Sequence, residues 1–125
     1  KIEFETFNFS ENLINYFSKV NFAITRSGSS MLAELSNYSI PFVSVPLPSS
    51  ADNHQLKNAE YYQKKNLAFL IEEKDLKDKL FQLIKEIYED GSKLEKLKKN
   101  LSQYSDKNVY KSINKELVKI INEKN

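Results

Sequence analysis

The sequence predicts an α/β fold in which a Rossmann-like parallel sheet, residues 1–72, is followed by three C-terminal helices, residues 73–125. Short apolar runs alternate with helical patterns of about ten residues, which is typical of βα units with a parallel sheet. The run 40–46 is apolar on both faces and bracketed by prolines, as a buried parallel strand should be. A helical apolar period then begins after Glu72. We expect both ranges to be parts of one domain.

Composition excludes several classes of protein and site. The 125 residues suffice for one domain with a real core. There is no cysteine, which excludes disulfides, thiolate metal sites and cysteine nucleophiles. The 19 basic and 17 acidic residues nearly balance, which argues against a nucleic-acid surface. No apolar run reaches the roughly 20 residues that span a bilayer, and no signal peptide is visible, so we expect a cytoplasmic protein.

The first segment is predicted to contain a strand and a short helix. Apolar and polar residues alternate over 1–9, which is the period of a strand. Ser10 is a suitable N-cap for the helix after it. The apolar face of that helix consists of Leu13, Ile14 and Phe17.

Two βα units are predicted next. Residues 22–25 form a strand, and a helix runs from Ser29 or Ser30 to Tyr38, with Met31, Leu32 and Leu35 inward. A strand over 40–46, a helix from about 53 to 65 and a strand over 67–71 complete the sheet.

Three helices are predicted after the sheet. Asp90-Gly91 closes the first, Ser92 caps the second, and Asp106 is a candidate cap for the third. Each has an apolar stripe at helical spacing: Leu76, Leu80, Leu83, Ile84 and Ile87; Leu94, Leu97 and Leu101; Val109, Ile113, Leu117, Ile120 and Ile121.

The turn over 25–34 is a candidate anion site. A short strand enters a turn of small residues, which contains Gly28, and a helix then begins. Backbone N–H groups can approach a phosphate there, and the helix N-terminus favours negative charge. A plain helix start capped by serine is the alternative. Arg26, the only arginine among the 19 basic residues, also lies in this turn, and its role stays open.

Polar side chains follow the next strand, so they are expected beside the turn at the carboxyl edge of the sheet. His54, Gln55 and Asn58 offer donors and acceptors suited to sugar hydroxyls. His54 is the only histidine, and a helix-terminal contact is a better interpretation than a general base, because Asp52 does not face it in a helix. Glu34 suits the two hydroxyls of a ribose, or simply complements the helix dipole. No carboxylate cluster has metal-ligand spacing.

The segments 26–35 (RSGSSMLAEL), 40–41 (IP), 45–48 (VPLP) and 51–59 (ADNHQLKNA) together resemble the MurG family of glycosyltransferases, within family 28. The similarity covers nearly the whole chain. It implies the C-terminal, donor-binding half of a two-domain GT-B fold. Because Lys1 stands in place of methionine, we expect truncation of a longer enzyme that carries the acceptor domain and two glycine-rich loops.

The resemblance also implies roles for individual residues. The backbone near Ser10 would contact uracil, and Glu34 would bind the ribose hydroxyls. His54, Gln55 and Asn58 would face N-acetylglucosamine. The segment along the pyrophosphate and into the helix would comprise Gly28, Ser29, Ser30, Met31, Leu32 and Ala33.

The implied reaction is inverting transfer of N-acetylglucosamine from UDP-GlcNAc to undecaprenyl-pyrophosphoryl-muramoyl-pentapeptide, in peptidoglycan synthesis. No metal or other cofactor is expected, and this chain alone would lack catalysis. The full-length enzyme would associate peripherally with the cytoplasmic face of the inner membrane. Two alternatives stay open: the donor-binding subunit of a two-subunit GlcNAc transferase, and a non-catalytic nucleotide-sugar-binding module.

Overall fold

Three short parallel strands form the centre of the fold: β1 (Ala23–Thr25), β2 (Phe42–Ser44) and β3 (Phe69–Leu70), hydrogen-bonded in the order β1-β2-β3. Ile24 pairs with Val43, and Ser44 pairs with Leu70. The computed structural model describes residues 3, 6, 14–104 and 117–122, with the backbone alone at 14 and 15. The predicted parallel sheet is confirmed.

The middle strand is buried on both faces. Phe42, Val43 and Ser44 are each fully buried, and Pro41 and Val45 extend the buried run beyond both ends. A strand with neighbours on both edges and helices over its faces has no contact with water, so it carries no polar alternation. This explains why the sequence of this strand is apolar apart from the buried Ser44.

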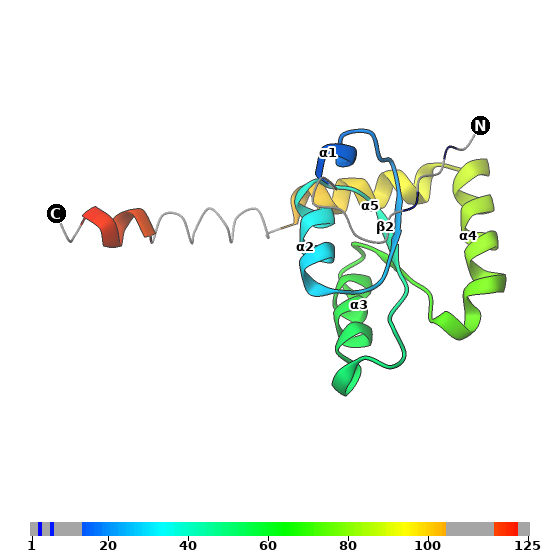
Figure 1. Cartoon of the computed structure of the whole chain (residues 1–125). Coiled ribbons are helices and arrows are strands. Elements are labelled where there is room, and N and C mark those ends of the chain that lie inside the picture. Colours follow the sequence, from blue (N-terminus) through cyan, green and yellow to red (C-terminus); the bar gives the residue numbers. More distant parts are fainter. Residues whose placement is uncertain (1–2, 4–5, 7–13, 105–116, 123–125) are drawn as a thin grey trace.

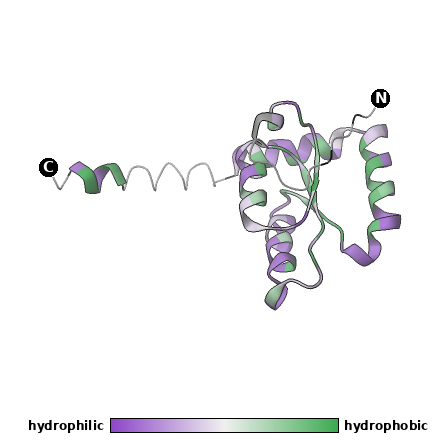
Figure 2. Ribbon diagram, viewed as in Figure 1, coloured by the Kyte–Doolittle hydropathy of each residue, from purple (hydrophilic) through white to green (hydrophobic). Residues whose placement is uncertain are grey.

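The connecting helices lie on one side of the strands (Figure 1). They are α2 (Ser29–Asn37) and α3 (His54–Lys64), and α3 is preceded by the 3₁₀ turn η1 (Ala51–Asn53). The short helix α1 (Ile14–Phe17) contacts the end of α2 through the edge-on rings of Phe17 and Tyr38, whose centroids are 5.2 Å apart. Figure 2 shows hydrophobic residues along the strands and hydrophilic ones over much of the helices. The buried core consists of Phe17, Leu32, Leu35, Ile40, Phe42, Tyr62, Leu67, Ala68 and Leu101.

Both connecting helices end in the same turn although neither has a glycine there. Ser39 follows α2 with φ 54°, and Asn66 follows α3 with φ 57°. In each case the next residue donates its N–H five residues back, from Ile40 to the Leu35 carbonyl and from Leu67 to the Tyr62 carbonyl. This is the Schellman pattern, which satisfies terminal carbonyls and returns the chain into the sheet.

The helices after the sheet pack unequally. The 3₁₀ turn η2 (Glu73–Asp75) leads into α4 (Leu76–Glu89), and α5 (Ser92–Gln103) follows. Leu97 and Leu101 of α5 are buried, so α5 closes the core. The predicted apolar stripe of α4 is only half-buried, and α4 stands apart from α2 and α3, across the strands (Figure 1).

The start of α5 differs from the prediction, because Ser92 is its first residue and not its cap. Gly91 occupies the N-cap position, and the Asp90 carboxylate accepts hydrogen bonds from the Ser92 N–H and hydroxyl, both at 3.0 Å. These bonds lower the pKa of the Asp90 carboxyl. A carboxylate two residues before a helix thus takes the role that was expected of serine.

Several predicted features lie outside the described residues: the strand over 1–9 except for Glu3 and Thr6, Ser10 with Leu13, and the third C-terminal helix at residues 106–116. Residues 117–122 are helical and exposed. Within the described part of the chain, no helix has the length and apolar character needed to cross a bilayer.

Candidate functional site

The candidate site lies where the three strands end, and Arg26 connects these ends. Arg26 follows β1, its Nη1 donates to the Val45 carbonyl after β2 at 3.4 Å, and its Nη2 lies 2.5 Å from Glu73 Oε1 after β3. Both side chains are nearly half exposed, so we assign this pair an ordering role and little stabilisation. The only arginine of the chain therefore contacts residues after β2 and β3 at the carboxyl edge of the sheet.

The start of α2 presents backbone donors that no side chain caps. Gly28 is the N-cap, and the first helical bond runs from the Leu32 N–H to the Gly28 carbonyl. The preceding N–H groups, of Ser29, Ser30 and Met31, thus have no acceptor within the helix. A serine side chain therefore does not cap this helix, and the N–H groups at its start stay available to an anion.

Gln55 joins the loop after β1 to the loop after β2. Its Oε1 accepts hydrogen bonds from the Ser27 N–H at 3.2 Å and from the Leu47 N–H at 2.9 Å. Both partners are donors, so they fix which end of the amide is oxygen. Its own backbone N–H donates to Ser50 Oγ at 3.3 Å.

Asn58, one turn further along α3, reaches the same backbone from the other side. Its Nδ2 donates to the Ser27 carbonyl at 3.0 Å. The structure therefore brings the Gln55 and Asn58 side chains together, because both bind the backbone of one other residue.

Ser27 is that residue, and sequence reasoning missed it. It is fully buried, and its hydroxyl has no partner among the described residues. Its position directly before Gly28 is the only sequence signal for this role, since serine is common in such turns.

Glu34 lies in the second turn of α2, half-buried, and its carboxylate makes no hydrogen bond or ion pair with another described residue. The helix-dipole effect falls off within the first turn. Dipole complementarity is therefore a weak explanation for this carboxylate, and it stays available to a ligand.

His54 begins α3 and is exposed. The two residues before it, Asp52 and Asn53, have φ of 52° and 56°, and no ion pair joins Asp52 to His54. Without a carboxylate to orient the ring, the arrangement expected of a general base is absent from these described residues.

The remaining predicted residues contribute in different ways. Leu32 is fully buried in the core, so only its backbone could meet a ligand, whereas Met31 and Ala33 are half-buried. Ser10 lies outside the described residues. No cluster of three metal-binding side chains occurs in the described part of the chain.

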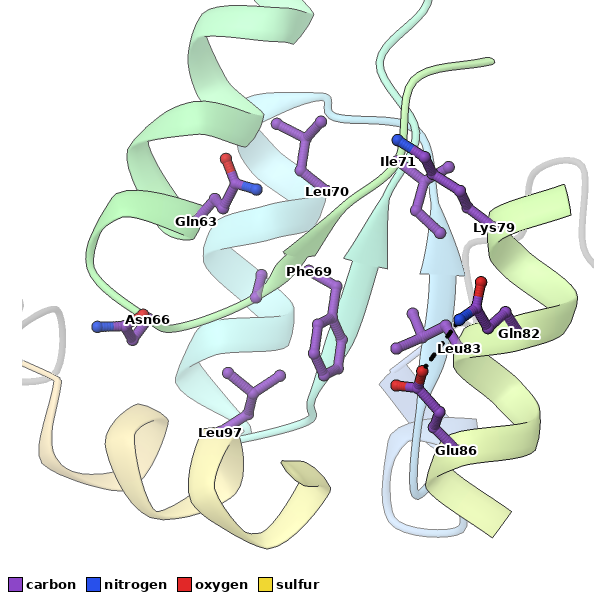
Figure 3. Close-up of a pocket in the computed structure, with 11 residues that line it drawn as sticks. Gln63, Asn66, Phe69, Leu70, Ile71, Lys79, Gln82, Leu83, Glu86 and Leu97 are labelled. Atoms are coloured by element: carbon purple, nitrogen blue, oxygen red, sulfur yellow. Dashed lines mark hydrogen bonds between the residues drawn. The ribbon is translucent and has the colours of Figure 1, made fainter. Parts of the chain in front are cut away.

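A cavity of about 360 Å³ lies elsewhere, between β3 and α4. Phe69, Leu83 and Leu97 form apolar walls, and Gln82 donates to Glu86 at 3.4 Å (Figure 3). Lys93 contacts Glu86 at 2.5 Å and, by hydrogen bond and charge, lowers the pKa of that carboxyl. No residue of the loops after β1 and β2 lines this cavity, so we place the candidate site at those two loops, where the polar groups converge.

Comparison with known proteins identifies relatives for nearly the whole chain. The sequence profile of the glycosyltransferase family 28 C-terminal domain matches residues 1–117. A UDP-N-acetylglucosamine–N-acetylmuramyl-(pentapeptide) pyrophosphoryl-undecaprenol N-acetylglucosamine transferase from Pelagibacter ubique is 34% identical over 98% of this chain and 35% of its own length. The protein of the same name from Rickettsia bellii is 33% identical over 80% of this chain and 28% of its own length.

A solved structure shares the fold. The crystal structure of Acinetobacter baumannii MurG matches with a TM-score of 0.67 and 20% identity, over 89% of this chain and 33% of that chain. The predicted Rossmann-like arrangement is thereby confirmed. The chain spans about a third of the length of the relatives it matches.

Proposed function

Because the chain belongs to glycosyltransferase family 28, whose C-terminal domain it carries over residues 1–117, we propose that it binds the nucleotide-sugar donor of an N-acetylglucosamine transferase. The donor is UDP-GlcNAc, and the acceptor is the undecaprenyl-pyrophosphoryl-muramoyl-pentapeptide of peptidoglycan synthesis. The names of the relatives support both. One observation carries the proposal. The uncapped start of α2 lies at a strand end, and Gln55 connects it to the loop after the neighbouring strand, β2.

Each part of the donor has a place along these two loops. The diphosphate lies at the N–H groups of Ser29 to Met31, because an anion supplies the acceptors that the helix start lacks. The ribose lies further along α2, at the unpaired carboxylate of Glu34. The sugar lies toward His54, Gln55 and Asn58 in the first turns of α3.

The reaction is an inverting displacement at the sugar C1. The acceptor oxygen forms a bond to C1 while the bond from C1 to the UDP oxygen breaks, and UDP departs with the electron pair. Negative charge then grows on the diphosphate, where the fixed N–H dipoles at the start of α2 stabilise it. The acceptor hydroxyl loses its proton to a group outside this domain.

Donor binding in this proposal needs no metal or other cofactor, since the helix start supplies the charge complementarity. The acceptor is held by other parts of the polypeptide, which also associate peripherally with the cytoplasmic face of the inner membrane.

Replacing Glu34 by alanine tests the ribose assignment. In a full-length transferase that carries this domain, calorimetric titration of UDP-GlcNAc should show roughly 10- to 100-fold weaker affinity, the effect of losing hydrogen bonds to a charged group. The titration should be unchanged by EDTA, because no metal takes part.

Glu95→Ala is the matched control, since Glu95 is exposed on α5, away from the strand-end loops. Unchanged affinity in Glu34→Ala would refute the ribose assignment. Equal binding of UDP-glucose would instead favour a generic nucleotide-sugar module.

A further inference from the structure

Gln55 and Asn58 were expected to face the sugar, yet their observed contacts are with protein backbone. Both hydrogen bonds of the Gln55 side chain use its oxygen, on the Ser27 and Leu47 N–H groups. The Asn58 side chain donates to the Ser27 carbonyl. The two amides thus hold the peptide groups on either side of Ser27.

The residue they hold directly precedes the start of α2. Gly28 and the N–H groups after it follow Ser27 without a break, so the position of Ser27 sets the position of the helix start. Ser27 is fully buried, and its main-chain groups point away from water into these two side chains. Buried backbone groups require partners, which makes the two amides hard to replace.

The same Gln55 oxygen also reaches the Leu47 N–H, in the loop that follows β2. One atom therefore joins the loop beside the diphosphate to the loop beside the sugar. Resting on the function proposed above, we propose that Gln55 and Asn58 are positioning residues, which hold the start of α2 in register with the Leu47 loop before any donor binds.

This role predicts a pattern that direct sugar contact does not produce. A residue that only touches N-acetylglucosamine affects binding of UDP-GlcNAc but leaves binding of UDP unchanged, because UDP has no sugar. A residue that positions the diphosphate site weakens both ligands by the same factor. The use of the Gln55 oxygen also predicts that glutamate, which keeps an acceptor, preserves the two N–H bonds, whereas methionine removes them.

The experiment compares Gln55→Met and Asn58→Ala with the unaltered protein, in the full-length transferase. We expect both variants to bind UDP and UDP-GlcNAc about tenfold more weakly, the effect of losing a hydrogen bond of ordinary strength. Without ligand, the Ser27 and Leu47 amides should exchange with solvent deuterium about tenfold faster in Gln55→Met. Gln63→Met is the matched control, because Gln63 lies on the same helix and its exposed side chain makes no hydrogen bond to the described residues.

Loss of UDP-GlcNAc affinity with unchanged UDP affinity and unchanged amide exchange would overturn the positioning role and leave the proposed function standing. Failure of the unaltered protein to bind either ligand would refute the proposed function, while the exchange measurement would still test the positioning contacts. If Gln55→Met does not fold, Gln55→Glu replaces it: protection of both amides supports the proposal, and its loss contradicts it.

Discussion

At the residue scale, the fold tolerates a side chain at position 28, whereas the proposed ligand does not. Its backbone is ordinary for any residue, with φ −65° and ψ 135°, and a Cβ there would meet nothing within 4 Å. The fold therefore does not require glycine at the start of α2. In the proposed site, close approach of a phosphate would require glycine, since a methyl group would occupy space beside the N–H groups.

We expect Gly28→Ala to lower the free energy of unfolding by no more than about 1 kcal/mol, because alanine is a poorer N-cap than glycine. Affinity for UDP should fall about tenfold, measured by calorimetry in the full-length transferase. Gly91→Ala is the matched control, because Gly91 precedes α5 with equally open space around it. Unchanged UDP affinity in Gly28→Ala would place the diphosphate elsewhere.

The polar residues at the strand ends could be named from the sequence, but their partners could not. Ser-Gly turns and amide-rich helix starts are visible in sequence, and the structure places Gln55 and Asn58 together at Ser27. Their bonds to Ser27 join residues that are 28 and 31 positions apart in the sequence, which no local pattern encodes. The Arg26 contact with Glu73 spans 47 residues and was unpredictable for the same reason.

At the element scale, Asn66 tests how the chain turns from α3 into β3. Its φ of 57° is costly for most residues, tolerable for asparagine and free for glycine. We expect Asn66→Ala to lower the free energy of unfolding by about 1 kcal/mol and Asn66→Gly to lower it by less or raise it. Urea denaturation of the chain measures both. Both variants lose the asparagine side chain. If they are destabilised equally, the lost side chain is the cause, and the left-handed backbone is not.

Strands and helices were predicted well where the apolar period was strong, and their ends less well. The strand over 40–46 was found because burial on both faces leaves an unmistakable apolar run. The two turns after α2 and α3 carry no glycine, so the usual signal for a left-handed residue was missing at Ser39. The half-buried stripe of α4 shows that period alone does not reveal how deeply a helix packs.

At the scale of the whole molecule, the proposed function assigns the strand-end loops to one substrate only. The described site residues offer N–H donors, amides and the Glu34 carboxylate, all of which suit a nucleotide sugar. Transfer also requires an acceptor site and a group that takes the acceptor proton. His54, the only histidine, is exposed, and no ion pair with Asp52 orients it.

We therefore expect the 125-residue chain alone to give no turnover when it is mixed with UDP-GlcNAc and the lipid-linked acceptor. A coupled assay that detects released UDP measures turnover, and the full-length transferase is the positive control. A His54→Gln variant of the full-length protein sharpens the test, since loss of a general base lowers kcat by about 10²- to 10⁴-fold and loss of a helix-terminal contact does not. Turnover by the chain alone, or a kcat loss of that size in His54→Gln, would show that the general base lies in this domain. His54 would then be the first candidate for that base.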